Sequence, residues 1–192
     1  MIKSIVLSIK SPHALNIMDG YKTLELRKRV PKGFKGWVYP YITLAKPYLY
    51  QSRYNLNYFL KQYKMETIEP ELRPELLNGT IPFRFWFDEY DLISYTQDFE
   101  EEVNGINMIE EKAYYITCGE LKQSCLTYDE LLKYGKGKDL YAWHIKKLEI
   151  FDKPMQVGDF IGTNNTTLTK APATYQYVYL KGENKWLNYF TC

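Results

Sequence analysis

The sequence predicts one mixed α+β domain in which strands dominate. The first observation is its aromatic content, with 19 Tyr, 9 Phe and 4 Trp among 192 residues, because aromatic residues favour strands. The second is a series of short stretches with alternating polar and apolar residues, separated by turn signals such as Asn78-Gly79. A partly closed barrel would protect the edges of so many strands. Hydrophobic residues make up 45% of the chain, which is enough for a core.

The first elements follow directly from the pattern. Residues 4–10 alternate, with one apolar face, and predict a strand. Ser11 is the expected N-cap of a two-turn helix, with Pro12 at its first helical position. This helix would cover residues 13–19, and Gly20 stands where a left-handed C-cap is needed.

The later elements rest on similar signals. Thr127 and Glu130 form a capping-box pattern that predicts a helix ending at Gly135. Trp86 lies in a run that is apolar on both faces, so we expect it in the core. The other expected elements are strands over 23–29, 82–87, 141–151 and 175–180, a strand opening at 36–39, a partly helical stretch at 56–63, irregular chain at 69–74 and an exposed loop around 100–105.

Charge is unevenly distributed along the chain although the net charge is only +2. Residues 1–53 hold ten basic against two acidic residues, whereas residues 66–130 hold four against sixteen. A basic face attracts phosphates, and the acidic middle is equally consistent with a solvated surface. Charge therefore permits nucleic-acid binding without requiring it.

Cysteine usage and hydropathy exclude several classes of protein. The three cysteines and two histidines show no zinc-ligand spacing, so we expect no metal and no cofactor. No stretch reaches the length of a membrane span, and the first residues do not resemble a signal peptide. We therefore expect a soluble, cytoplasmic protein that does not bind membranes.

The most informative segment covers residues 20–27. If residues 23–29 form a strand, Leu24 and Leu26 point to the core, and Thr23, Glu25 and Arg27 share the opposite, solvent-side face. Lys22 lies at the entry to the strand. An arginine can bind a phosphate or a base edge through two hydrogen bonds, and a carboxylate can orient it or accept from an exocyclic amine. The alternative is a surface ion-pair cluster of little energetic value.

Several further residues are candidates for the same site. Lys10, Lys28 and Arg29 flank the segment and are plausible phosphate contacts, with a solvated basic edge as the alternative. His144 is either a hydrogen-bonded structural group or a residue of the cleft. Trp143 could stack on a base, but burial in the strand explains it better.

These residues carry a resemblance to a known family. Gly20-x-Lys22-x-x-Glu25-x-Arg27 matches the Gly-x-Lys-x-x-Glu-x-Arg signature of the ASCH family, whose domains resemble PUA domains. Three other segments resemble bacterial and phage members in the same order along the chain: residues 7–12, residues 141–154 and residues 168–178. The resemblance implies a PUA-like, partly open β-barrel with short flanking helices. It also implies a single ASCH domain over residues 1–192, with a variable acidic insertion around 66–130.

The resemblance implies a cleft for RNA or a nucleotide, with Lys10, Lys22, Glu25, Arg27, Lys28 and Arg29 as binding residues and Thr23, His144 and Tyr175 as cleft-lining candidates. Two departures limit what it carries over. Residues 173–175 read Ala-Thr-Tyr where related members often have Gln-Ser-Trp. One branch removes an acetyl group from a modified cytidine, and its catalytic threonine aligns with Glu25, which cannot replace an activated hydroxyl. Its lysine corresponds to Lys22.

Three functions remain open from the sequence. The first is RNA or nucleotide binding through the basic cleft. The second is hydrolysis of RNA or a modified nucleoside, in which Lys22 and Glu25 would be the catalytic pair. The third is an interaction module of a phage or mobile element that contacts a protein through the acidic segment 66–130.

Overall fold

The structure is a computed structural model that describes residues 2–51, 75–97 and 112–182. The expected helical stretch at 56–63, the irregular chain at 69–74 and the loop at 100–105 lie outside these residues. Contacts divide the chain into two compact units. The first comprises residues 1–18, 36–85 and 148–192, and the second residues 19–35 and 86–147.

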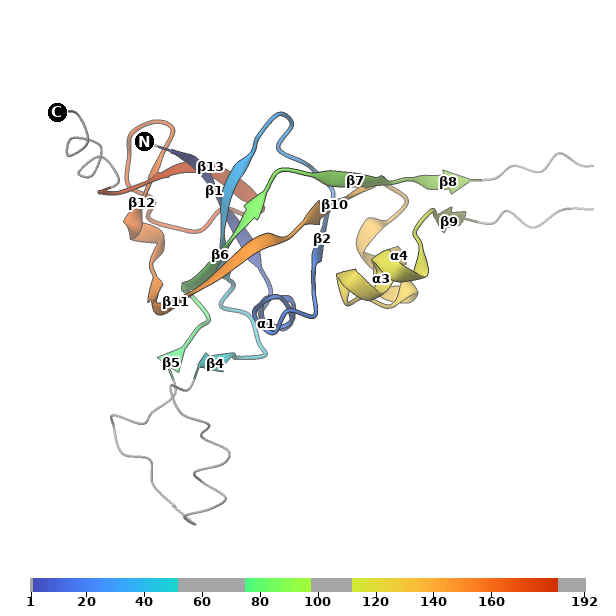
Figure 1. Cartoon of the computed structure of the whole chain (residues 1–192), viewed down its shortest axis with the longest axis horizontal. Helices are drawn as coiled ribbons and strands as arrows, with labels where there is room; N and C mark the ends of the chain where they lie inside the picture. The colour runs from blue at the N-terminus through green and yellow to red at the C-terminus, as the bar shows by residue number, and fades with distance from the viewer. Residues whose placement is uncertain (1, 52–74, 98–111, 183–192) are drawn as a thin grey trace, which may run out of the picture. The chain divides into compact units, whose positions relative to one another are not determined.

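A six-stranded sheet forms the framework of the first unit (Figure 1). Its strand order is β11-β6-β3-β1-β13-β12, so the sheet has two ends and is open. Strand β1 pairs in parallel with β3 and antiparallel with β13. This confirms the mixed α+β class. The strands are β1 (Lys3–Ile9), β3 (Gly36–Ile42), β6 (Ile81–Phe87), β11 (Lys146–Met155), β12 (Phe160–Gly162) and β13 (Tyr175–Leu180), with a 3-10 turn at Val157–Asp159 before β12.

Strand β1 is buried on both faces, which corrects the prediction of one apolar face. Ser4 and Val6 are as inaccessible as Ile5 and Leu7, at 0–1% exposed. Val6 packs in a cluster with Tyr39, Ile81, Phe160, Leu168 and Val178. A strand in the middle of a sheet needs apolar residues on both faces when both are covered.

Helix α1 (Ser11–Met18) follows β1 as expected, but Ser11 does not cap it. The carbonyl of Lys10 accepts the first helical hydrogen bonds, from the amides of His13 and Ala14. The Ser11 hydroxyl instead donates to the carbonyl of Pro47 at 2.5 Å. Helix α1 ends before Gly20, which adopts the predicted left-handed conformation with φ +77°.

The turn at Asn78-Gly79 is also confirmed, with Gly79 at φ +90°. It follows a short pair of strands, β4 (Tyr50–Gln51) and β5 (Glu75–Leu76). The buried amide of Asn78 donates to the carbonyls of Thr43 and Ala45 and accepts from the amide of Leu49. One side chain thus fixes the loop that leads to β4.

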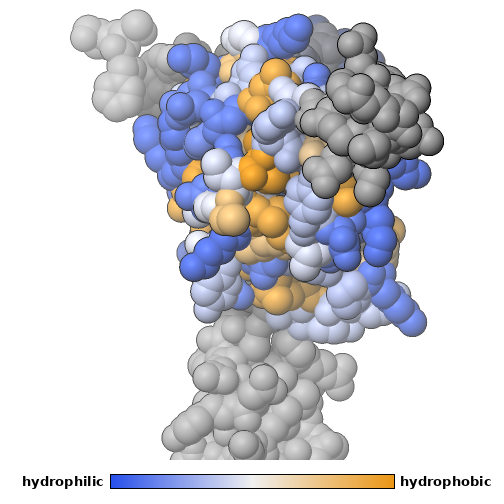
Figure 2. All heavy atoms as spheres, turned by 90° about the vertical axis from the view of Figure 1, so that its right-hand side faces the viewer, coloured by the Kyte–Doolittle hydropathy of each residue, from blue (hydrophilic) through white to orange (hydrophobic). Residues whose placement is uncertain are grey.

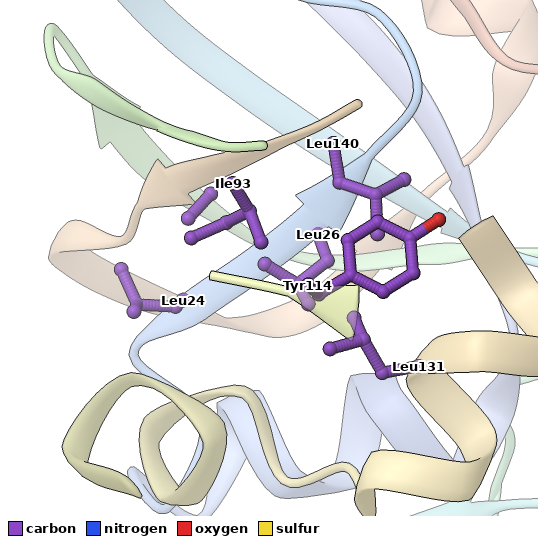
Figure 3. Close-up of a cluster of buried hydrophobic side chains, with 7 residues drawn as sticks. Leu24, Leu26, Ile93, Tyr114, Leu131 and Leu140 are labelled. Carbon is purple, nitrogen blue, oxygen red and sulfur yellow. The ribbon is translucent and has the colours of Figure 1, made fainter. Parts of the chain in front are cut away.

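The second unit contains a three-stranded antiparallel sheet in the order β2-β10-β7. One face of this sheet packs into an apolar cluster in which Leu24 and Leu26, as predicted, lie with Leu131, Leu140 and Tyr114 (Figure 3). The elements of this unit are β2 (Leu24–Arg27), β7 (Tyr90–Ile93), β8 (Tyr95–Gln97), β9 (Lys112–Tyr114), α3 (Cys118–Ser124), α4 (Tyr128–Gly135) and β10 (Leu140–His144).

Among the described residues of the second unit, both helices begin with a capping box. The predicted box of α4 is confirmed, and α3 has a second one between Thr117 and Glu120. Helix α4 reaches Gly135, but the left-handed residue that ends it is Lys136, with φ 54°. Gly135 is required for space, because a Cβ there would lie 1.8 Å from the Tyr114 hydroxyl oxygen.

The strand predicted over 141–151 is two strands, β10 and β11, interrupted at Ile145. Lys147 just beyond the break has a positive φ of 45°, a conformation that L-residues rarely adopt and that locally disrupts the strand.

Trp86 is half-buried rather than fully buried, and the Lys147 ammonium lies 5.4 Å from its ring centre. The prediction that Trp86 is core is therefore wrong.

Within the described residues, no helix is long and apolar enough to cross a bilayer. Apolar side chains nevertheless reach the surface, and Figure 2 shows them as an orange band between hydrophilic residues on one face. In the second unit the exposed large hydrophobic residues include Tyr90, Leu92, Tyr115 and Tyr134. Most of these are tyrosines, which can combine an apolar contact with a hydrogen bond.

Candidate functional site

Strand β2 carries the signature segment and is shorter than predicted. It covers Leu24–Arg27 instead of 23–29. Thr23 precedes it and is exposed, but its backbone is fixed on both sides. Its amide donates to the carbonyl of Gln123, and its carbonyl accepts from the amide of Ile145. The start of β2 is thus anchored to the end of α3 and to the end of β10.

The side chains of Lys22, Glu25 and Arg27 form a continuous ion-pair cluster, which we call the triad. Glu25 lies between the two cations. Its Oε2 is 3.3 Å from Lys22 Nζ, and its Oε1 is 3.0 Å from Arg27 Nε. Lys22 Nζ also donates to the carbonyl of Ser124 at 2.5 Å. The prediction that these three side chains lie close together is confirmed.

Lys22 and Glu25 are buried and Arg27 is partly buried, which corrects the prediction that Glu25 lies on a solvent-side face. The side chains of Lys22, Glu25 and Arg27 are 2%, 7% and 16% exposed. Glu25 lies directly across from Trp143 in the sheet. Trp143 is 0% exposed and packs against Phe87, with ring centres 4.9 Å apart and planes tilted by 50°. Aromatic residues distant in sequence thus cover the part of this face that holds Glu25.

Burial changes the meaning of the cluster. Exposed ion pairs contribute little to stability, but a buried pair has lost its hydration, and removing one partner leaves an uncompensated charge. The Glu25 carboxylate compensates two cations at once. It also fixes the Arg27 side chain at Nε, one of the five donors of a guanidinium. Arg27 is the most exposed of the three.

Tyr134, at the end of α4, lies beside the same arginine. Tyr134 is 38% exposed, and desolvation of the part of it that is buried raises its pKa; the positive charge of Arg27 lowers it, and the negative charge of Glu25 raises it. The ammonium of Lys28 lies 5.4 Å from the Tyr134 ring centre. The end of α4 and the end of β2 are therefore in contact around Arg27, and this contact had no signal in the sequence.

The other residues predicted for the site do not all lie near Arg27. Lys28 and Arg29 follow β2 and are exposed, so both remain suitable for phosphate contacts. His144 is half-buried, and its Nε2 lies 2.6 Å from Asp91 Oδ2. It stands opposite Leu24, hence on the other face of the sheet from Arg27. Lys10 is exposed and Tyr175 is half-buried, and both belong to the first unit.

Besides Tyr134, two further residues of this site were not predicted from the sequence. The carbonyl of Ser124 binds Lys22, and a backbone acceptor so far along the chain leaves no trace in the sequence. Tyr141 lies directly opposite Arg27. The position of Tyr141 could have been predicted from the sequence. Tyr141 and Trp143 are two residues apart in a predicted strand and therefore share a face.

The described residues contain no group of three or more His, Cys, Asp or Glu side chains that could hold a metal ion. Cys118 and Cys125 are free thiols at the two ends of α3. The chemistry that the site offers is that of cations, a carboxylate and phenols.

Comparison with known proteins defines the fold. No protein-family model and no curated protein sequence matches this chain. Among solved structures, the crystal structure of ASCH from Zymomonas mobilis matches with a TM-score of 0.51 and 13% identity, over 98% of this chain and 96% of that one. A tyrosine-to-phenylalanine variant of the same protein gives 0.50 and 12%, over 98% and 99%. A serine-to-alanine variant gives 0.50 and 13%, over 98% and 96%.

These matches cover nearly the whole of both chains, so the fold is that of an ASCH domain. At 12–13% identity the likeness establishes the fold alone.

Proposed function

We propose that this protein is an ASCH protein that binds RNA or a nucleotide through the surface around Arg27. Two independent observations support the proposal: the ASCH fold and the Gly-x-Lys-x-x-Glu-x-Arg spacing at residues 20–27. We propose further that residues 1–192 form one ASCH domain with a variable acidic insertion around 66–130.

The observation that carries the proposal is the buried triad. Burying charges costs free energy, and apolar replacements of similar size are often as stable as a buried ion pair. A cluster of this kind is therefore better explained by what it positions. Glu25 forms an ion pair with Arg27, with Oε1 3.0 Å from Nε, and is itself paired with Lys22. The guanidinium is thus oriented before any ligand arrives, which reduces the entropic cost of binding a phosphate.

The exposed cations next to Arg27 support an anionic ligand. Lys28 and Arg29 extend the basic surface directly from the end of β2. Cations at such positions attract the phosphate backbone without selecting a sequence. We assign Lys28 and Arg29 to phosphate contacts, and Arg27 to the oriented contact at the centre.

The position of Lys22 favours binding over catalysis. A general acid or base must reach its substrate within hydrogen-bond distance. The Lys22 ammonium is 2% exposed, and the carbonyl of Ser124 and the carboxylate of Glu25 occupy it. We therefore assign Lys22 a positioning role, as the group that fixes Glu25, and not the role of a catalytic residue.

Fluorescence anisotropy with a labelled mixed-sequence RNA tests the proposal. Arg27→Met should weaken binding about tenfold and reduce the salt dependence of the affinity by about one counterion. The matched control is Lys153→Met, which removes an exposed cation from β11. This variant should bind the labelled RNA with the affinity of the unsubstituted protein. Equal affinity of the Arg27→Met variant and the unsubstituted protein would refute the proposal.

A further inference from the structure

The face of the β2-β10-β7 sheet that carries Glu25 and Arg27 has two rows of side chains. Residues directly opposite one another in a sheet share a face. The pairing of β10 with both neighbours therefore gives one row of Glu25, Trp143 and Tyr90, and a second row of Arg27, Tyr141 and Leu92.

The two rows differ in their accessibility. At the centre of the first row, Trp143 is fully buried. Tyr90 at its end is 41% exposed, and Leu92 in the second row is 54% exposed. Tyr141 is half-buried between Arg27 and Leu92. Tyr90 and Tyr141 contact each other at 73°, with ring centres 5.7 Å apart. An accessible pair of tyrosines thus lies beside the oriented arginine.

We infer that Tyr90 and Tyr141 form a stacking surface for unpaired bases, so that the ligand of this site is single-stranded RNA. This inference rests on the proposed function. Aromatic side chains bind bases through their flat faces, independently of the base. Because the two rings are nearly perpendicular, they cannot stack on one base together. A base can therefore stack on the face of one ring, while the other ring contacts that first ring edge to face.

The position of Arg27 suits a nucleotide held in this way. Cβ atoms of directly opposite residues in a sheet are about 5 Å apart, and Arg27 is directly opposite Tyr141. A nucleotide whose base stacks on Tyr141 therefore has its own phosphate within reach of the Arg27 side chain. Lys28 continues the basic surface toward the next phosphate.

Charge favours RNA over a protein segment as the occupant. In strands β2, β10 and β7, the carboxylates are Glu25 and Asp91. Glu25 is bound to two cations, and Asp91 lies on the other face with His144. The stacking surface therefore has a cationic border at β2, and the two carboxylates that precede Tyr90, Asp88 and Glu89, are both paired with Lys146. A duplex is excluded as a stacking partner because its bases are hidden between their neighbours.

The test compares single-stranded and duplex RNA by fluorescence anisotropy. The probe is a labelled mixed-sequence RNA of about eight nucleotides, alone or annealed to its complement. We expect the single strand to bind at least about tenfold more tightly than the duplex. Tyr141→Leu and Tyr90→Leu should each weaken single-strand binding about tenfold, with the salt dependence unchanged because no charge is removed.

Two controls separate stacking from misfolding. Tyr141→Phe keeps the ring and should bind as the unsubstituted protein does. Tyr115→Leu removes a tyrosine that is 63% exposed and lies outside the three strands, and it should also have no effect. Circular dichroism and thermal unfolding establish that each variant is folded.

The outcomes distinguish the inference from the function on which it rests. If Arg27→Met weakens RNA binding but the leucine variants and the duplex bind as well as the reference, the stacking surface is wrong and the proposed function stands. If RNA binding is absent or independent of Arg27, both are wrong. Loss of affinity in Tyr141→Phe equal to that in Tyr141→Leu would assign the effect to the hydroxyl and refute stacking.

Discussion

The second unit contains two ion-pair clusters of the same size and opposite character. In the triad, the side chains of Lys22, Glu25 and Arg27 are 2%, 7% and 16% exposed. In the other cluster, Lys146 pairs with Asp88 at 2.9 Å and with Glu89 at 2.8 Å. These three side chains are 41%, 32% and 55% exposed. The ion-pair distances in the two clusters are similar, but the exposure of their side chains to solvent differs.

The difference shows which cluster is expected to serve a ligand. Water and salt screen the exposed cluster, so it costs little and contributes little. The triad is largely shielded from water, so its charges depend for their stabilisation on being held in one arrangement. An arrangement held in this way is preorganised, which is what an anion-binding site requires.

The largest effect should come from Glu25→Gln. This change leaves two buried cations without their shared carboxylate, and we expect it to lower the free energy of unfolding by about 3–5 kcal/mol. Denaturant titration monitored by circular dichroism measures the change. The matched control is Glu89→Gln in the exposed cluster, which should leave the unfolding midpoint in place. Equal losses in the two variants would show that burial does not distinguish the clusters.

Arg27→Met should have a smaller effect on stability and a larger one on binding. Glu25 keeps Lys22 as its partner, so we expect a loss of about 1–3 kcal/mol in the free energy of unfolding. The affinity for RNA should fall about tenfold in the same variant. A stability loss as large as that of Glu25→Gln would mean that Arg27 is chiefly structural.

The alkaline titration of Tyr134 reports on the charge of Arg27. Burial raises the pKa of Tyr134 above its ordinary value of about 10. The unfolded chain therefore loses this proton first, so the stability that the neutral phenol contributes is present below about pH 10 and is lost as the pH rises through the folded-state pKa. Tyr134→Phe should flatten this alkaline decline.

The same titration links Tyr134 to the triad. Arg27 lowers the pKa of Tyr134, so Arg27→Met should raise it further, whereas Lys146→Met should leave it unchanged. Phenolate absorbance, with Tyr134→Phe as the subtraction control, measures the shift. An unchanged titration in Arg27→Met would contradict the placement of Tyr134 beside Arg27.

The smallest effect should come from Lys146→Met. The hydrogen bond from Lys146 lowers the pKa of Asp88, so the contribution of this pair is present above the ordinary carboxyl pKa and is lost as the pH falls through the folded-state value. We expect no change in the unfolding midpoint at neutral pH and a rise in the pKa of Asp88, measured by NMR. A clear loss of stability at neutral pH would show that the exposed cluster matters.

Local chemistry made much of the fold predictable. Glycine in the left-handed conformation at Gly20, the turn at Asn78-Gly79 and the capping box at Thr127 all depend on neighbouring residues, and the structure confirms them. Helix α3 carried the same signal, with Thr117 and Glu120 at capping-box spacing. It could have been predicted in the same way.

The burial of the site could not be read from the sequence. Alternation placed Leu24 and Leu26 correctly in the core, but it cannot say whether the other face is covered. That depends on Phe87 and Trp143, which pack together far along the chain from Glu25. Strand β1 could not be predicted fully for the same reason. Val6, on the face expected to be polar, is as buried as Ile5 and Leu7 on the apolar face.

The most direct test of the account replaces the triad as a whole. The variant Lys22→Met, Glu25→Leu, Arg27→Met fills the same space without charge. Since buried ion pairs rarely exceed apolar packing in stability, we expect a folded protein with a free energy of unfolding within about 2 kcal/mol of the original. Its affinity for RNA, measured by anisotropy, should fall at least about tenfold. A variant that binds RNA as tightly as the unsubstituted protein would contradict the claim that the triad exists to orient Arg27.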